Sequence, residues 1–187
     1  HSKKGPPAAS NERIRKMYQL ITELTMTLNY ERVLEKSLDS TFIALRLSDF
    51  STEKLVSAVF LFSEEELGAP DLYVAYGKGL PRPDLSRTTP GIEGLLEQVI
   101  ESGDTLTTKE LPKDPELNQY FAFQSCQSGY CMPLRSGFDT FGVLMFAHPE
   151  VDYFNTDVKE IINTVGHQAQ IAMQNAHLFQ ELKDGRV

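Results

Sequence analysis

Two apolar runs near the middle of the chain give the clearest indication of its fold. Tyr130–Leu134 and Phe141–Ala147 contain mainly aliphatic and aromatic residues, and Gly137 and Asp139 between them favour a tight turn. This pattern predicts a β-hairpin. The second run does not alternate between apolar and polar residues, so both of its faces must be covered. We therefore expect the hairpin to lie in the centre of a sheet that has other elements packed above and below it.

The segments before the hairpin add strands and a loop-rich middle region. Two nearly apolar strands are predicted at Leu55–Phe62 and Leu72–Tyr76. The region from Leu80 to Gln127 has little regular structure, which is typical of lids and ligand-binding loops and less often of plain connectors. Its expected elements are a short amphipathic helix ended by Gly103, a strand at Thr105–Thr108 and helical turns at Asn118–Gln124 with aromatic residues facing inward.

Helices are predicted at both ends of the folded part. From Asn11 onward, apolar residues recur at steps of three and four residues, and Asn29 is expected to end this helix and to cap a second one. The apolar positions of the first helix are Ile14, Met17, Ile21, Leu24 and Leu28. Those of the second helix are Val33, Leu34, Leu38, Phe42 and Leu45. A last, unusually long helix is capped by Asn155 or Thr156 and runs to about Lys183.

The last helix carries two apolar stripes on different sides. The first stripe suits the sheet and the first helix, and consists of Val158, Ile161, Ile162, Val165, Ala169, Ala172, Ala176 and Phe179. The second stripe consists of Ile171, Leu178 and Leu182. A second stripe needs a second partner. We expect a parallel homodimer whose interface joins these three residues to Ile14, Met17, Ile21 and Leu24. The alternative is that both stripes pack within one chain.

Composition narrows the classes of function. The net charge is −8, from 18 basic and 26 acidic residues, and this balance argues against duplex nucleic acid or an anionic membrane surface as a partner. No apolar run is long enough to cross a membrane, and two cysteines make no disulfide framework. We expect a cytoplasmic domain with free thiols. Residues 1–10 have no periodicity and are expected to be a disordered lead-in or an expression remnant.

Four segments in a fixed order resemble the GAF domain, a small-molecule sensor module of signalling proteins, including two-component systems. They are Ser128-x-x-x-Met132-Pro133-Leu134, Phe141-Gly142-Val143-Leu144, Phe154-Asn155-Thr156-Asp157 and Gln168–Ala176. The resemblance covers residues 11–183, with 156–183 as the terminal signalling helix and 184–187 as a tail. It implies an α+β fold with a six-stranded antiparallel sheet, the N- and C-terminal helices on one face and a lid on the other. A PAS domain is the alternative fold, but its sheet is not followed by such a long returning helix.

The resemblance implies a non-catalytic regulatory sensor that binds a small molecule beneath the lid and signals through its terminal helix to an output domain outside this chain. The residues that would converge on the pocket are Tyr76, Phe121, Phe123, Cys126 and Ser128. The alternative is that the aromatic residues only fill a second core, which leaves a structural dimerisation module. Neither the ligand nor a cofactor can be identified from these residues.

Catalytic and metal chemistry find no support in the sequence. Cys126 and Cys131, five positions apart on an extended segment, are expected to face opposite ways and to be core residues, although Cys126 next to the lid is the better candidate for a redox sensor. Chromophore-binding members usually place a histidine directly after a lid cysteine, whereas Gln127 and Met132 follow here. The cysteine cluster of sulfoxide-reducing members and the signature of cyclic-nucleotide-binding members are also absent. His167 and His177 do not share a helix face, so we expect no metal site.

Overall fold

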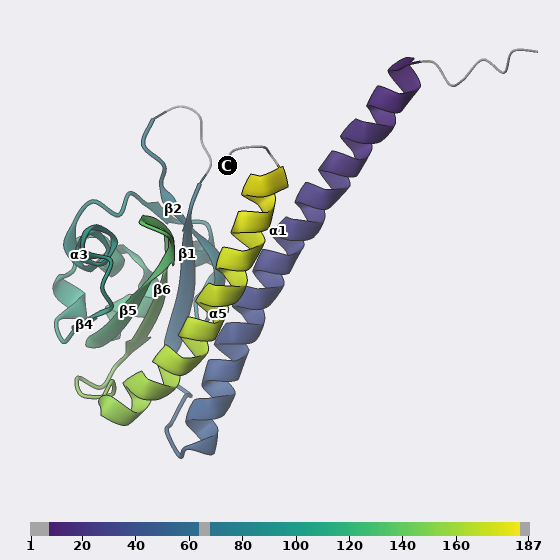
Figure 1. The fold of residues 1–187 in the computed structure, drawn as a ribbon. Helices are drawn as coiled ribbons and strands as arrows, with labels where there is room; N and C mark the ends of the chain where they lie inside the picture. Colours follow the sequence, from purple (N-terminus) through teal and green to yellow (C-terminus); the bar gives the residue numbers. More distant parts are fainter. Residues whose placement is uncertain (1–7, 64–67, 184–187) are drawn as a thin grey trace, which may run out of the picture.

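The fold is a single sheet with two long helices on one face and a set of short elements on the other (Figure 1). It is taken from a computed structural model. The backbone is described for residues 8–63 and 68–183, and the side chains for the same residues apart from 8–10, 22–30 and 176–183. The α+β architecture with a six-stranded antiparallel sheet is confirmed.

The predicted hairpin is β5 and β6, and it lies inside the sheet. The strands are β1 (Val56–Phe62), β2 (Leu72–Lys78), β3 (Thr88–Thr89), β4 (Leu106–Thr108), β5 (Ser128–Ser136) and β6 (Asp139–His148). Their order is β3-β2-β1-β6-β5-β4, so β1 and β6 are the central pair. Gly142 of β6 permits this pairing, because a Cβ atom there would lie 2.3 Å from the carbonyl oxygen of Phe60.

Alternate residues of the central strands belong to two separate cores. We call them the helix-side core and the lid-side core. Along β6, Val143 and Met145 face the lid, whereas Leu144 and Phe146 face the helices, and all four are buried. A strand that is apolar on both faces is therefore covered on both faces, as the sequence pattern requires.

The N-terminal helix differs from the prediction. A single helix α1 (Ala8–Leu47) replaces the two expected helices, and it begins inside the segment 1–10 that was expected to be disordered. Asn29 does not end it. Asparagine lowers helix propensity only modestly, and no Gly or Pro occurs nearby to stop the helix. The buried face of its second half matches the prediction and consists of Leu34, Leu38, Phe42 and Leu45.

The C-terminal helix α5 (Thr156–Lys183) lies antiparallel to α1 and covers the same face of the sheet (Figure 1). The backbone N–H of Val158 donates to Asn155 Oδ1 at 2.9 Å, so Asn155 is the N-cap, one of the two predicted candidates. Val158 and Ile162 are fully buried in the helix-side core, together with Met173, which was not part of the predicted stripe. No helix among the described residues is long and apolar enough to span a membrane.

Short elements cover the other face and form the lid. They are α2 (Arg82–Leu85), α3 (Gly94–Ser102), η1 (Leu111–Lys113), η2 (Leu117–Gln119) and α4 (Phe121–Gln124). Gly103 ends α3 in the left-handed conformation, with φ of 70°, as predicted.

Candidate functional site

The five residues proposed to converge on a pocket do not converge. Phe123 and Cys126 lie in the lid-side core with almost no exposed surface. Phe121 of α4 is 50% exposed instead of facing inward, and the guanidinium carbon of Arg87 lies 5.1 Å from its ring centroid. The interior of the lid therefore includes two of the five residues, and a third lies on its surface.

Tyr76 faces the helices because of a β-bulge. Val59 of β1 pairs with Tyr76 and Phe60 pairs with Val74, so Ala75 is an extra residue in β2. The extra residue reverses the side-chain alternation: Val74 packs against the lid-side core, whereas Ala75 and Tyr76 pack against the helix-side core. Burial, together with the nearby acidic side chains of α1, raises the pKa of Tyr76.

Ser128 is also directed away from the lid. Its side chain is fully buried, and its hydroxyl donates to the carbonyl oxygen of Glu150 at 2.6 Å. It precedes Tyr130 and Met132 on the same side of β5, and these two belong to the helix-side core. Ser128 therefore ties β5 to the segment that leads into α5.

The lid-side core consists of buried side chains from the sheet and the lid. Tyr120 is fully buried at its centre, with its ring centroid 5.5 Å from that of Phe60 and 5.6 Å from that of Phe123. The Tyr120 hydroxyl has no hydrogen-bond partner in the described part of the chain. Burial, which is the larger cause, and the nearby charge of Asp84 together raise the pKa of Tyr120 to about 12. Sequence reasoning placed an aromatic cluster here but did not single out Tyr120.

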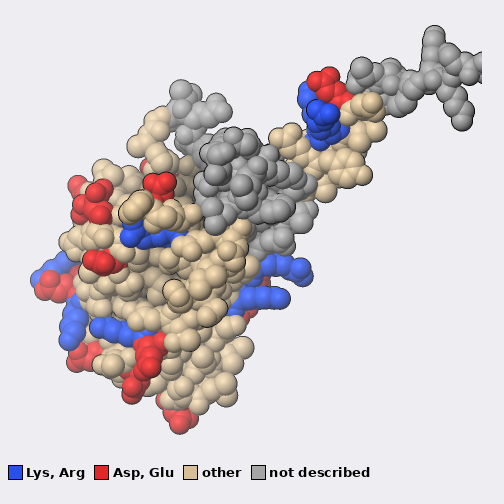
Figure 2. Space-filling view, in the orientation of Figure 1, with Lys and Arg blue, Asp and Glu red and all other residues tan. Residues whose placement is uncertain are grey.

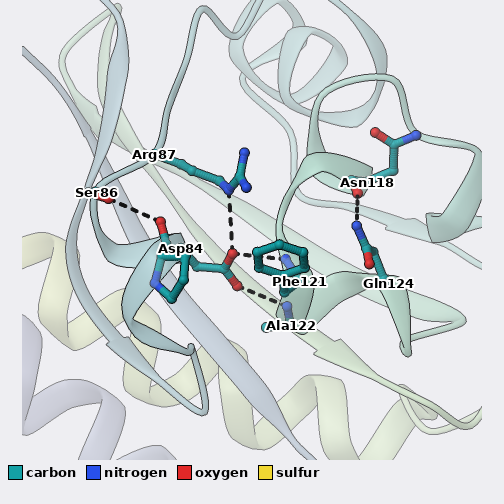
Figure 3. A network of polar contacts seen from close by, with 8 residues as sticks. Asp84, Ser86, Arg87, Asn118, Phe121, Ala122 and Gln124 are labelled. Carbon is teal, nitrogen blue, oxygen red and sulfur yellow. Dashed lines mark hydrogen bonds and ion pairs between the residues drawn. The ribbon is translucent and has the colours of Figure 1, made fainter.

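Asp84 fixes one end of the lid (Figure 3). Its carboxylate is fully buried and accepts the backbone N–H groups of Phe121 and Ala122, each at 2.9 Å. These N–H groups belong to the first turn of α4, where they have no partner within the helix. Arg87 Nε lies 3.7 Å from the same carboxylate. Asp84 therefore joins α2 to α4, two elements that are far apart in the sequence.

Asp114 and Glu116 fix the other end of the lid. Asp114 Oδ2 accepts the N–H of Leu95 in the first turn of α3 at 2.7 Å, although the two residues lie in different segments. Glu116 accepts the N–H groups of Gly91 and Glu93, both at 2.7 Å, and also the hydroxyl of Thr89. Sequence reasoning read this segment as a turn and missed both carboxylates. Two acids around a proline in a structureless region were the only available signal.

The two cysteines share the lid-side core, contrary to the expectation that they face opposite ways. The prediction assumed an extended chain between them, but β5 begins only at Ser128, and a turn around Ser125 precedes it. Burial raises the pKa of the Cys126 thiol to about 11, and it also raises the pKa of Cys131. The described residues contain no group of three or more potential metal ligands. Both cysteines behave as core residues.

We compared the sequence of this chain with those of known proteins. No family model matches the chain. A protein described as an uncharacterized sensor-like histidine kinase from Chloroflexus aurantiacus is 26% identical over 182 residues. The match covers 95% of this chain but only 28% of the length of that protein.

Solved structures share the fold at low sequence identity. The blue-light absorbing form of the PixJ GAF domain from Thermosynechococcus elongatus has a TM-score of 0.61 at 14% identity, over 87% of this chain and 95% of that chain. The GAF domain of a two-component sensor histidine kinase from Bacillus halodurans has a TM-score of 0.58 at 18% identity, over 79% and 97%. A type II free methionine-R-sulfoxide reductase from Thermoplasma acidophilum has a TM-score of 0.52 at 14% identity, over 76% and 96%.

We predict that Asp84→Ala loosens the lid. Removing the carboxylate leaves two backbone N–H groups of α4 without their acceptor, which should lower the free energy of unfolding by about 1–3 kcal/mol. Amide hydrogen exchange at Phe121 and Ala122 should accelerate. Asp104→Ala, at an exposed position on the surface, is the control and should change neither quantity. Unchanged exchange at both amides in Asp84→Ala would contradict this role.

We predict that Cys126 is a poor nucleophile in the folded protein. Because burial raises its pKa to about 11, its thiolate is scarce at neutral pH, and the reaction with iodoacetamide should accelerate as the pH rises towards that value. At neutral pH the rate should be roughly 100-fold below that of the same chain unfolded in urea. Peptide mass spectrometry distinguishes Cys126 from Cys131. Equal rates in the folded and unfolded chains would restore the redox interpretation.

Proposed function

We propose that this chain, which has the GAF fold, is a non-catalytic regulatory sensor domain of a larger signalling protein. It binds a small molecule on the lid side of its sheet and passes the signal through α5 to an output domain. The chain is similar to part of a protein described as a sensor-like histidine kinase, and this similarity supports an output domain outside the given sequence. A domain with the same fold occurs in a two-component sensor histidine kinase.

The buried hydroxyl of Tyr120 is the observation that carries the ligand-binding part of the proposal. A buried polar group without a partner is unfavourable, and such groups in folded proteins call for an explanation. Tyr120 links the lid elements η2 and α4 and points into the lid-side core, and Asp84, Asp114 and Glu116 hold the lid through hydrogen bonds to backbone N–H groups. A ligand that replaces side chains in this core and bonds to Tyr120 would reposition the lid.

A dimerisation module without a ligand is the second candidate, and two observations favour it. The lid-side core is filled by its own side chains. The first half of α1 extends past the sheet (Figure 1), and Ile14, Met17 and Ile21 on it are 50%, 60% and 56% exposed. Ile171 on α5 is 40% exposed.

The proposed partner for this apolar surface is a second copy of the chain, bound in parallel through α1 and α5. Leu24, Leu178 and Leu182, the other proposed interface residues, lie in helices, but their side chains are outside the described residues. A dimer formed in this way is compatible with sensing, because α5 would belong both to the interface and to the route to the output domain.

We predict opposite effects of removing two buried tyrosine hydroxyls. Tyr120→Phe should leave the free energy of unfolding unchanged or raise it by up to about 1 kcal/mol, because the lost hydroxyl has no partner among the residues that the structure describes. Tyr153→Phe should lower it by about 1 kcal/mol, because the Tyr153 hydroxyl donates to the Ser51 carbonyl oxygen at 2.7 Å. Urea unfolding measures both changes.

The same pair of variants tests ligand binding. Small molecules released from the purified protein by denaturation are identified by mass spectrometry and added back to fresh protein. The sensor proposal expects them to raise the midpoint of thermal unfolding of the wild type and of Tyr153→Phe, but not of Tyr120→Phe. No released molecule and no shift would leave the dimerisation module as the better account.

We predict that Met17→Glu disrupts the dimer. A charge in the centre of the apolar surface of α1 should lower the mass measured by light scattering from twice the chain mass of 21.0 kDa to once that value. Ile92→Glu is the matched control, because Ile92 is 67% exposed on the lid side and should leave the mass unchanged. A wild-type protein that stays monomeric at high concentration would exclude the dimer.

A further inference from the structure

A groove of about 690 Å³ lies outside the lid-side core, between the end of α3, strand β5 and helix α5. Met132 and Pro133 of β5 supply apolar lining, Thr105 follows α3, and α5 contributes polar side chains between Asn163 and Gln170. The pairing of β4 with β5 ends at Cys131, so β4 does not cover this part of β5. The groove therefore results from the short length of the edge strand.

The charges in the groove contrast with the rest of the chain. The protein has 26 acidic and 18 basic residues, yet no Asp or Glu is found among the described residues that line this groove. Arg135 and His167 are its ionisable residues. On the face shown in Figure 2, acidic and basic side chains are interspersed around a broad uncharged area. Among the described residues, the lining of the groove itself therefore carries no carboxylate.

Arg135 has unused hydrogen-bonding capacity. Its Nη2 donates to the Phe138 carbonyl oxygen at 3.1 Å, but its Nε is buried and has no hydrogen-bond partner among the described residues. Four cationic side chains of the described part form ion pairs with carboxylates, namely Lys78, Arg87, Lys109 and Lys113. Arg135 is not one of them. Its charge is therefore not neutralised by the described residues.

Arg135 contacts two neighbouring elements, one through its guanidinium and the other through its backbone. A Cβ atom at Gly103 would lie 2.4 Å from Arg135 Nη1, so the absence of a side chain there lets the guanidinium rest against the end of α3. On the other side, Gln174 of α5 donates to the Arg135 carbonyl oxygen at 2.5 Å. Arg135 thus contacts both the end of α3 and the terminal helix, and its guanidinium lies between Gly103 and the Phe138 carbonyl oxygen.

We propose that this groove binds a small organic oxyanion, a carboxylate or a phosphate ester, with Arg135 as its charged partner. The planar guanidinium matches the oxygen geometry of both groups, and the groove volume is in the range of small-molecule sites. His167, Gln170 and Thr105 supply further hydrogen-bonding groups around the ligand. The site lies outside the lid-side core, so it requires no opening of the lid and does not depend on the function proposed above.

Titration with matched pairs of probes tests the proposal. Succinate and glycerol 3-phosphate are the anionic probes, and 1,4-butanediol and glycerol are their uncharged counterparts. In two-dimensional ¹H–¹⁵N spectra of the whole chain, we expect saturable shifts of the amide signals of Gly103, Thr105 and Gln170 with an anionic probe. The uncharged probes should cause none. The relative affinity of the two anions shows whether a carboxylate or a phosphate is preferred.

Two variants assign the binding to the groove. Gln170→Glu keeps the size of the side chain and adds a negative charge beside Arg135, so the dissociation constant should rise about fivefold or more. Arg135→Gln should raise it about tenfold or more. Gln119→Glu adds the same charge on the lid surface, away from the groove, and should leave the constant unchanged. If Arg135→Gln fails to fold, Gln170→Glu decides the question.

Three outcomes would overturn the proposal. The first is the absence of saturable shifts with either anion. The second is equal affinity in the wild type, Arg135→Gln and Gln170→Glu. The third is a saturable response to the uncharged probes. In any of these cases Arg135 only supports the negative end of α3, where a cation is favourable without a ligand.

Discussion

The structure depends on the pairing of β1 with β6, two strands that are apolar on both faces. Exposing either face of this pair to water would be unfavourable. The free-energy cost of the exposed apolar area would exceed the net free energy contributed by the hydrogen bonds between the strands. Phe60 and Val143 must be covered on one face, and Val59 and Leu144 on the other. The long helices cover one face and the lid covers the other. Each candidate site discussed above lies in one of these two layers or between them.

The two layers are attached by different interactions. The helices α1 and α5 pack through continuous apolar faces, in which Leu38, Leu45 and Ile162 are buried. The lid consists of short elements that cannot satisfy their own terminal N–H groups, and the carboxylates of Asp84 and Asp114 accept these bonds from a distance in sequence. Local opening of a protein begins where few continuous contacts oppose it, so the lid is the layer suited to respond to a ligand.

Most periodic features of the fold could be predicted from the sequence, apart from the expected helix break at Asn29, and the features that depend on distant contacts could not. The hairpin, the Asn155 cap and the end of α3 at Gly103 follow from local patterns. The bulge at Ala75 does not, because it depends on the pairing of two strands. As a result of this bulge, Tyr76 lies on the helix side of the sheet and not on the predicted lid side. The carboxylates of the lid were missed for the same reason, since their partners lie far away in the chain.

The candidate sites differ in what a ligand must displace. In the lid-side core, a ligand would have to replace buried side chains such as Phe123 and recover the apolar burial that they provide, so only a molecule with a large apolar surface could bind there. A ligand in the groove at Arg135 would not have to displace any buried side chain, so a small polar molecule could bind there. The groove borders α5 directly: a Cβ atom at Gly166 would lie 2.7 Å from the sulfur of Met132, which lines the groove and belongs to the helix-side core. Strand β5 and helix α5 are therefore in direct contact at Met132 and Gly166.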